Sequence, residues 1–141
     1  MKPYMATVVA EEHLLVFQRI EQAMQKLPDI ELESDTKGKQ LVSCHIIARA
    51  LARIFPEVRY QDGYFARRGQ RHSWLIVRDD PRLIIDPYPI ALLGGPIMVH
   101  GGFVTTPWDE LYIKTKLTNL GGAQFRTHVN QVTKILKHIS T

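Results

Sequence analysis

The sequence predicts an α+β fold, in which helices before and after the middle of the chain pack on a small antiparallel sheet. Apolar residues recur with helical spacing near the N-terminus, over residues 40–55 and near the C-terminus. Between them, residues 58–88 form short runs of strand-forming residues separated by turn signals. A length of 141 residues suits one domain over residues 1–141, with enough chain to bury a hydrophobic core.

The first helix is predicted over Thr7–Lys26. Pro28 ends it, because the residue before a proline is disfavoured in the helical region. Its apolar residues fall largely on one side. They are Val8, Leu14, Leu15, Phe17, Ile20, Met24 and Leu27.

The second helix is predicted to begin at Gln40 or Ser43 and to stop before Pro56. The polar residues 29–39 before it are a predicted loop. One face of the helix repeats at i, i+3, i+4 and i+7 and is expected to turn toward the interior. This face consists of Cys44, Ile47, Ala48, Leu51 and Phe55.

Three strands are predicted after the second helix. The first is Val58–Asp62, and Gly63 is expected to form a bulge before this strand resumes. His72–Val77 and Leu83–Tyr88 flank the turn residues 78–82 and are predicted to form an antiparallel hairpin.

The last third of the chain begins with Ile90–Gly102, which is rich in glycine and is predicted as a loop or an irregular strand. Thr106–Glu110 resembles a helix start, with a proline in its first turn. A final amphipathic helix is predicted over Gln124–Ile139. Its apolar residues are Phe125, Val129, Val132, Ile135, Leu136 and Ile139.

The composition, 45% hydrophobic and 23% charged, is that of an ordinary soluble globular protein. The short apolar stretch Met5–Ala10 is followed at once by Glu11 and Glu12, which does not fit a secretion signal. No uninterrupted apolar run approaches the length that spans a membrane. We therefore expect a soluble, cytoplasmic protein without a membrane partner. The single cysteine, Cys44, excludes an intramolecular disulfide and provides no thiol cluster for a structural zinc ion, so no metal site is expected.

The net charge of +4 permits a polyanionic partner but does not require one. Arg67, Arg68 and Arg71 cluster before His72, but the chain lacks the interleaved aromatic and basic residues of a nucleic-acid module. We expect these charges to lie on a solvated surface. Nucleic-acid binding is accordingly the third of the functional hypotheses and not the favoured one.

Three residues, in their order along the chain, indicate nucleophilic catalysis. Cys44 opens an apolar helix, His72 opens a strand, and Asp86 lies on the next strand. If the turn is centred near Asp79, His72 lies opposite Asp86 and the two side chains share one face of the sheet. A slip of one residue would place them on different faces. A carboxylate in that position orients an imidazole and stabilises its protonated form.

The helix start favours a thiolate at Cys44, because free N–H groups and the positive end of the helix dipole stabilise negative charge. The same N–H groups can donate to the oxyanion that forms when a carbonyl is attacked. Gln40, four residues before the cysteine, is a candidate for a second donor. The sequence therefore predicts a Cys-His-Asp triad.

Each of these residues also has a structural interpretation. Cysteine is among the most often buried residues, and Cys44 lies on the apolar face of its helix. His72 can be a strand residue beside solvent, and Asp86 can shape the turn before Pro87. His45 is predicted to point elsewhere on the helix, as a surface or core residue and not as a metal ligand.

Three further residues are candidates for the walls of a substrate groove. His100 lies in a glycine-rich segment and can line a cleft, although an ordinary loop residue is the simpler interpretation. Trp74 and Trp108 can wall the groove, although tryptophan is more often part of the core.

The local sequences around these residues resemble the transglutaminase-like branch of the papain-like cysteine enzymes. That core has a cysteine at a helix N-terminus, a His-small-Trp motif that opens a strand, and an apolar-Asp-Pro motif on the next strand. The corresponding segments here are Ser43-Cys44, His72-Ser73-Trp74 and Ile85-Asp86-Pro87. The similarity covers about residues 36 to 90, and the second and third motifs are the more specific.

The resemblance implies a papain-like fold and acyl transfer through a thioester, without a cofactor. Family members include peptidases, protein-crosslinking transglutaminases, glutamine deamidases and amide hydrolases, so a protein or peptide substrate is implied. By position, Cys44 corresponds to the nucleophile, His72 to the general base and acid, and Asp86 to the residue that orients the histidine. Gln40 is a looser match to the oxyanion glutamine, which usually lies further from the cysteine. Residues 41–43 depart from the glycine or aromatic residue often found before the cysteine.

The leading hypothesis is a small cysteine enzyme that attacks an amide or thioester carbonyl. Hydrolysis is favoured over crosslinking, because no site for a second substrate is recognisable in a chain of this size. The main alternative is a catalytically inert binding domain that keeps the fold and buries Cys44.

Overall fold

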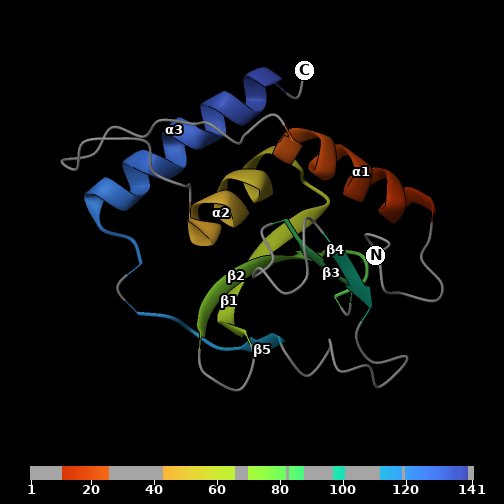
Figure 1. The fold of residues 1–141 in the computed structure, drawn as a ribbon, viewed down its shortest axis with the longest axis horizontal. Helices are drawn as coiled ribbons and strands as arrows, with labels where there is room; N and C mark the ends of the chain where they lie inside the picture. Colours follow the sequence, from red (N-terminus) through yellow and green to blue (C-terminus); the bar gives the residue numbers. More distant parts are fainter. Residues whose placement is uncertain are drawn as a thin grey trace.

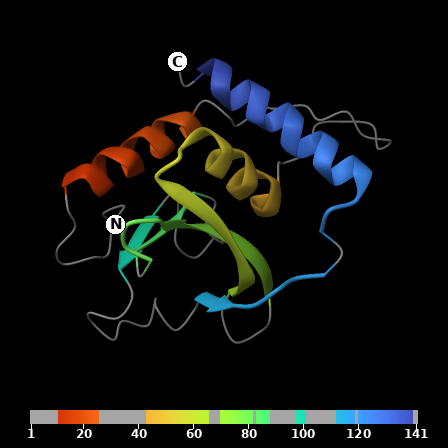
Figure 2. The same cartoon turned by 180° about the vertical axis from the view of Figure 1, so that it is seen from behind.

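The computed structural model describes residues 11–25, 43–65, 70–81, 83–87, 97–100, 112–118 and 120–139 (Figure 1). Over these ranges the chain forms three helices and one antiparallel sheet of five strands. The predicted α+β class is therefore confirmed. Figures 1 and 2 show the helices gathered on one side of the molecule and the strands on the other.

The helices are α1 (Glu11–Gln25), α2 (Cys44–Ile54) and α3 (Ala123–Ile139). All three lie where the apolar periodicity predicts them. The prediction for α1 is wrong at one position, because Leu15 was expected on the apolar side but is 54% exposed. Within the described residues, no helix is both long and apolar enough to cross a membrane.

The ends of α2 follow from local chemistry. Ser43 is the N-cap, with extended backbone angles and a side chain that accepts a hydrogen bond from the Ile46 N–H. At the other end the Phe55 N–H donates to the Leu51 carbonyl oxygen at 2.9 Å, and Pro56 follows. Cys44 is therefore the first residue of the helix.

The strands are β1 (Val58–Phe65), β2 (Gln70–Val77), β3 (Leu83–Asp86), β4 (Ile97–His100) and β5 (Tyr112–Lys114), in the spatial order β4-β3-β2-β1-β5. β4 falls within the segment predicted as a loop or an irregular strand. β5 was not predicted, because three residues are too few to show a period of two. The predicted helix start at Thr106–Glu110 lies outside the described residues.

The β2–β3 hairpin forms as predicted, but its register lies two residues away from the expected one. Leu75 pairs with Ile85, whereas the predicted register would have paired it with Leu83. His72 is therefore diagonal to Asp86 and not directly opposite it. Because a shift of two preserves the alternation of side chains, the two residues still share a face.

The core lies between the helices and the sheet, and α2 is at its centre, against β1, β2 and α3. The apolar faces predicted for α2 and α3 supply half of its helical residues. The fully buried members are Ile20, Ala48, Ala50, Leu51, Val58, Leu75, Leu83, Ile85, Val132 and Leu136.

Gly63 does not form the predicted bulge. The β1–β2 register runs without interruption from Val58 opposite Val77 to Phe65 opposite Gln70. A side chain at position 63 would overlap the backbone of Ile113 in β5. It would also lie 2.6 Å from the Trp74 ring, so glycine is required here for close approach.

We expect Gly63→Ala to lower the free energy of unfolding by about 2 kcal/mol or more, because the new methyl group must displace β5 or Trp74. Gly122→Ala is the matched control, since a Cβ at that position meets nothing within 4 Å. At this N-cap position the control should cost less than about 1 kcal/mol. Equal losses in urea unfolding of the two variants would contradict the close-approach explanation.

Candidate active site

Cys44 lies at the N-terminus of α2, directly after the Ser43 cap. Cys44 is partly exposed, whereas the residues that follow it on the same apolar face of α2 are buried. The first N–H groups of α2 and the positive end of its dipole therefore lie beside the thiol of a residue that is not fully buried. This placement fits a reactive cysteine better than a buried structural one.

His72 and Asp86 form a buried pair. The His72 Nε2 and Asp86 Oδ2 atoms are 2.8 Å apart, and the two residues are 1% and 0% exposed. The same Oδ2 atom accepts a hydrogen bond of 2.7 Å from the Tyr112 hydroxyl. Burial and the neighbouring carboxylate raise the pKa of Tyr112 far above its ordinary value, so this hydroxyl remains a donor.

Tyr112 lies on β5 and reaches Asp86 on β3 across the two strands between them, β1 and β2. On β1 it passes Gly63, which lies opposite His72 of β2 on one side and Lys114 of β5 on the other. Trp74 fills the space above the glycine and packs edge to face on Tyr112, with 5.1 Å between ring centroids. The site thus depends on a glycine and an edge strand that lie far from the cysteine in sequence.

Cys44 and His72 shift each other's ionisation. Burial raises the pKa of the Cys44 thiol, but hydrogen bonds with His45 and His72, and their charges, outweigh burial and lower the pKa to about 6. Burial lowers the pKa of His72, but hydrogen bonds with Asp86 and Cys44, and their charges, outweigh it and raise the pKa to about 9. Between these values the favoured state is a thiolate beside an imidazolium.

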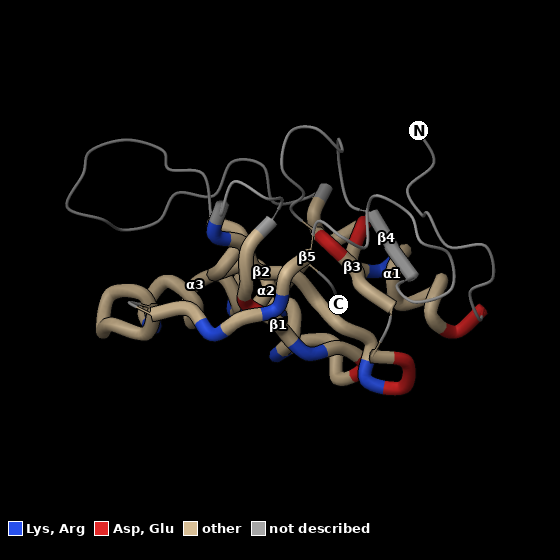
Figure 3. Tube along the Cα trace, turned by 90° about the horizontal axis from the view of Figure 1, so that it is seen from below, with Lys and Arg blue, Asp and Glu red and all other residues tan. Residues whose placement is uncertain are grey.

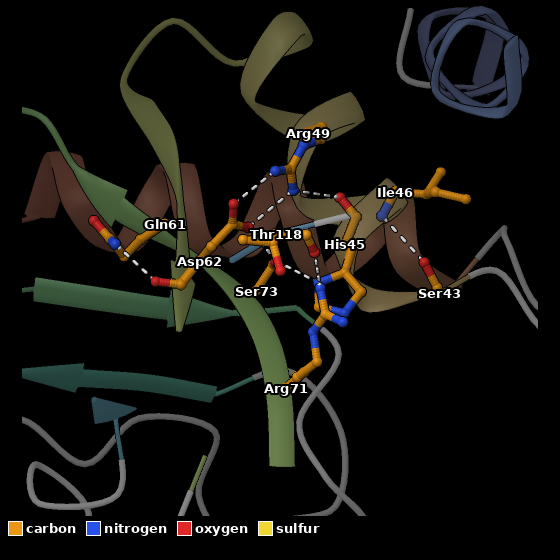
Figure 4. Close-up of polar contacts among 9 residues, drawn as sticks. All are labelled: Ser43, His45, Ile46, Arg49, Gln61, Asp62, Arg71, Ser73 and Thr118. Atoms are coloured by element: carbon orange, nitrogen blue, oxygen red, sulfur yellow. Dashed lines mark hydrogen bonds and ion pairs between the residues drawn. The ribbon is translucent and has the colours of Figure 1, made fainter. Parts of the chain in front are cut away.

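A second histidine, His45, also lowers the pKa of the thiol. The His45 Nδ1 atom lies 2.6 Å from the Ser73 hydroxyl oxygen, and that hydroxyl donates to Asp62 Oδ1 at 2.5 Å (Figure 4). Arg49 holds the same carboxylate through two hydrogen bonds of 2.9 and 2.7 Å. The bonds from Arg49 and Ser73 outweigh the effect of burial and keep the pKa of Asp62 below its usual range.

These contacts determine the tautomer of His45. A serine hydroxyl has one hydrogen, and at Ser73 this hydrogen goes to the Asp62 carboxylate, which can only accept. The Ser73 oxygen is therefore the acceptor toward His45, and Nδ1 of the ring carries a proton. Nε2 is then the ring nitrogen that remains available for a further hydrogen bond.

The structure therefore brings the three predicted catalytic residues together and adds three that the sequence did not indicate: His45, Ser73 and Tyr112. The prediction that His45 points elsewhere is wrong, because its ring turns toward Ser73 and the thiol. In the sequence, Ser73 is recognisable only as the small residue of the His-small-Trp motif. Knowledge of the β1–β2 register, which pairs Asp62 with Ser73, would have indicated the second network.

Of the other predicted site residues, Trp74 alone has its side chain in the described part of the structure. Trp74 is fully buried and packs on Tyr112 and Gly63, so it lies in the interior and does not line an open groove. His100 is the last residue of β4 and pairs with Leu83 through the backbone. The side chain of His100, and Gln40 and Trp108 as a whole, lie outside the described part of the structure.

The described residues contain no group of three or more histidine, cysteine, aspartate or glutamate residues arranged to hold a metal ion. Comparison of the chain with protein-family models, with curated proteins and with solved structures finds no match. The resemblance to transglutaminase-like enzymes therefore rests on the three local motifs alone.

Titration of Cys44 should give a midpoint near pH 6, followed through the ultraviolet absorbance of the thiolate with Cys44→Ser as the blank. The thiolate is favoured above this pH, and His72 remains protonated up to about pH 9. His72→Gln should raise the midpoint by one pH unit or more, because it removes both a hydrogen bond and a positive charge. A wild-type midpoint near the ordinary value of about 8.5 would contradict this arrangement.

Proposed function

We propose that this protein is a cysteine-dependent acyl-transfer enzyme that hydrolyses an amide through a thioester on Cys44. The observation that carries the proposal is the buried His72–Asp86 pair, 2.8 Å apart, together with the mutual effect by which His72 lowers the pKa of Cys44 and Cys44 raises that of His72. A nucleophile, a base within reach and a third group that orients the base are the requirements of covalent catalysis.

In the first half of the reaction the Cys44 thiolate attacks the carbonyl carbon of the amide, and the carbonyl oxygen becomes an oxyanion. The first N–H groups of α2 are positioned to donate to this oxyanion. The His72 imidazolium then gives its proton to the amine nitrogen. The carbon–nitrogen bond breaks, the amine leaves and the acyl group remains on the sulfur as a thioester.

In the second half neutral His72 takes a proton from water, and the resulting hydroxide attacks the thioester. The carbon–sulfur bond breaks, the acid is released, and the thiolate–imidazolium pair is restored. Asp86 stabilises the imidazolium in both halves. The partly exposed position of Cys44 suits a water molecule as the acyl acceptor.

The motifs around the three residues support a papain-like, transglutaminase-like core for this chain. A cysteine helix packed on an antiparallel sheet that carries the histidine and the aspartate on neighbouring strands is the arrangement that this resemblance implies. On this basis we propose that the substrate is a protein or a peptide, cleaved or deamidated at an amide group.

His45 has a supporting role in this proposal. With Nδ1–H bound to Ser73, its Nε2 atom can accept a proton from the thiol or hydrogen-bond to the thiolate as donor when the ring is protonated. His72 is then free to remain protonated for the leaving amine. The two histidines differ in their partners, since one is bound to a buried carboxylate and the other to a serine.

An activated ester provides the test that needs no knowledge of the natural substrate. With p-nitrophenyl acetate we expect a burst of p-nitrophenolate, one acetyl group on Cys44 by peptide mass spectrometry, and slow turnover. Asp86→Asn, which keeps the shape of the site, should lower the acylation rate about tenfold or more, because the imidazole loses its charged partner. His138→Gln removes an exposed histidine of α3 and should change nothing.

The competing interpretation, an inert binding domain, makes the opposite prediction for the same experiment. Cys44 would then be acetylated only after denaturation, at the same rate in wild type and Asp86→Asn. That result would exclude the proposed catalytic activity of Cys44.

The second histidine is tested by the pKa of Cys44. His45→Gln should raise this pKa by about one unit. Ser73→Ala should raise it by a smaller amount, because the ring keeps its place on the helix but loses the acceptor that fixes its tautomer. Thr127→Ala is the matched control, since among the described residues its hydroxyl bonds to the Ala123 carbonyl oxygen and to no group of the site. An unchanged Cys44 pKa in both site variants would show that His45 does not support the thiol.

A further inference from the structure

A depression of about 440 Å³ lies outside the thiol site, between α2, the start of β1, the end of β2 and the N-terminal part of α3. Its lining contains five arginines and no acidic residue. We call it the arginine pocket. The five are Arg49, Arg53, Arg59, Arg78 and Arg126.

Among the described residues, most of this positive charge has no neutralising partner. In that part of the chain Arg49 is the one pocket arginine paired with a carboxylate, that of Asp62. Arg53 donates to the Asn130 side-chain oxygen at 2.6 Å and Arg126 to the Gly121 carbonyl oxygen at 2.6 Å, both of them neutral acceptors. The remaining two are Arg59 on β1 and Arg78 directly after β2. Within the described ranges their side chains make no hydrogen bond or ion pair.

The surrounding chain does not supply the missing negative charge. No acidic residue follows Glu110 in the sequence, so α3 and the segment before it contribute only basic and neutral groups. Figure 3 shows few acidic residues on the side of the molecule that holds α3. Glu57, near the start of β1, is paired with Arg19, and Asp79 and Asp80 in the turn after β2 do not line the pocket. Like charges held together repel one another, and an anion in the pocket relieves that repulsion.

Stacking on aromatic rings also holds one arginine of the pocket, Arg49, in place. The Arg49 guanidinium lies over the Tyr60 ring at 4.2 Å from its centroid and 5.4 Å from that of Phe125. Tyr60 is 46% exposed, so its ring forms part of the accessible wall. The guanidinium group of arginine can donate two parallel hydrogen bonds to two oxygens of a phosphate group, and an aromatic wall adds a surface for stacking.

We propose that the arginine pocket binds a compact phosphorylated small molecule with at least two phosphate groups. Its volume falls in the range of small-molecule sites, roughly 300–1,000 Å³. The arginines come from four separate segments and surround one depression, whereas a nucleic-acid strand would need a track along the surface. This site shares Arg49 with the network of His45, but the binding of an anion in it does not require the proposed chemistry at Cys44.

Calorimetric titration with sodium tripolyphosphate tests the proposal. We expect saturable binding of one ion per chain that weakens as salt is added. Arg59→Ala/Arg78→Ala should weaken binding about tenfold or more, because both residues line the pocket and neither guanidinium group has a partner among the described residues. Arg49 is not a useful variant, since it also holds Asp62 in the network of His45.

The matched control is Lys134→Ala/Lys137→Ala, which removes the same charge from exposed positions of α3 outside the pocket. It should bind tripolyphosphate within about twofold of wild type. Cys44→Ser should bind as wild type does, which separates this result from the test of catalysis.

Three outcomes would overturn the proposal: no saturable binding at low salt, an equal loss of affinity in the lysine control, or a ligand of another class that binds better. Citrate binding as tightly as tripolyphosphate would assign the pocket to polycarboxylates. A short single-stranded oligonucleotide binding more tightly would assign it to nucleic acid.

Discussion

The buried carboxylate of Asp86 constrains more of this structure than any other group. A carboxylate without contact to water costs several kcal/mol of folding free energy unless hydrogen-bond donors and positive charge surround it. His72 and Tyr112 provide these donors, and both bond to the same oxygen atom. To bring them there, β2 and β3 must pair in an even register and β5 must join the far side of β1.

The same constraint explains the glycine of β1. Between His72 in β2 and Lys114 in β5, a side chain at Gly63 would meet Trp74 and the β5 backbone. Its absence lets Trp74 and Tyr112 pack on each other beside the histidine. An edge strand of three residues, which has little stability of its own, is thereby held by the chemistry of the site.

Two networks of different character converge on Cys44. The network through His72 and Asp86 is buried, so it can hold a positive charge beside the thiolate without screening by water. The network through His45 and Ser73 ends at Asp62 and Arg49, which are closer to solvent. Arg49 also lines the arginine pocket, so one side chain belongs both to the network of His45 and to that pocket.

The sequence by itself determined the fold class, the three helices, the β2–β3 hairpin and the residues of the predicted triad. Each depends on a short-range pattern: apolar spacing along a helix, alternation along a strand, or a cap such as Ser43 before Cys44. Only the tertiary structure decided the exact partner of each strand residue, the presence of β5 and the contacts of His45. A register shift of two leaves the pattern of buried and exposed residues unchanged, so the sequence could place His72 and Asp86 on one face without fixing their offset. Tyr112, Ser73 and Gly63 became meaningful only when the strands were paired, because their partners lie on other strands or on α2.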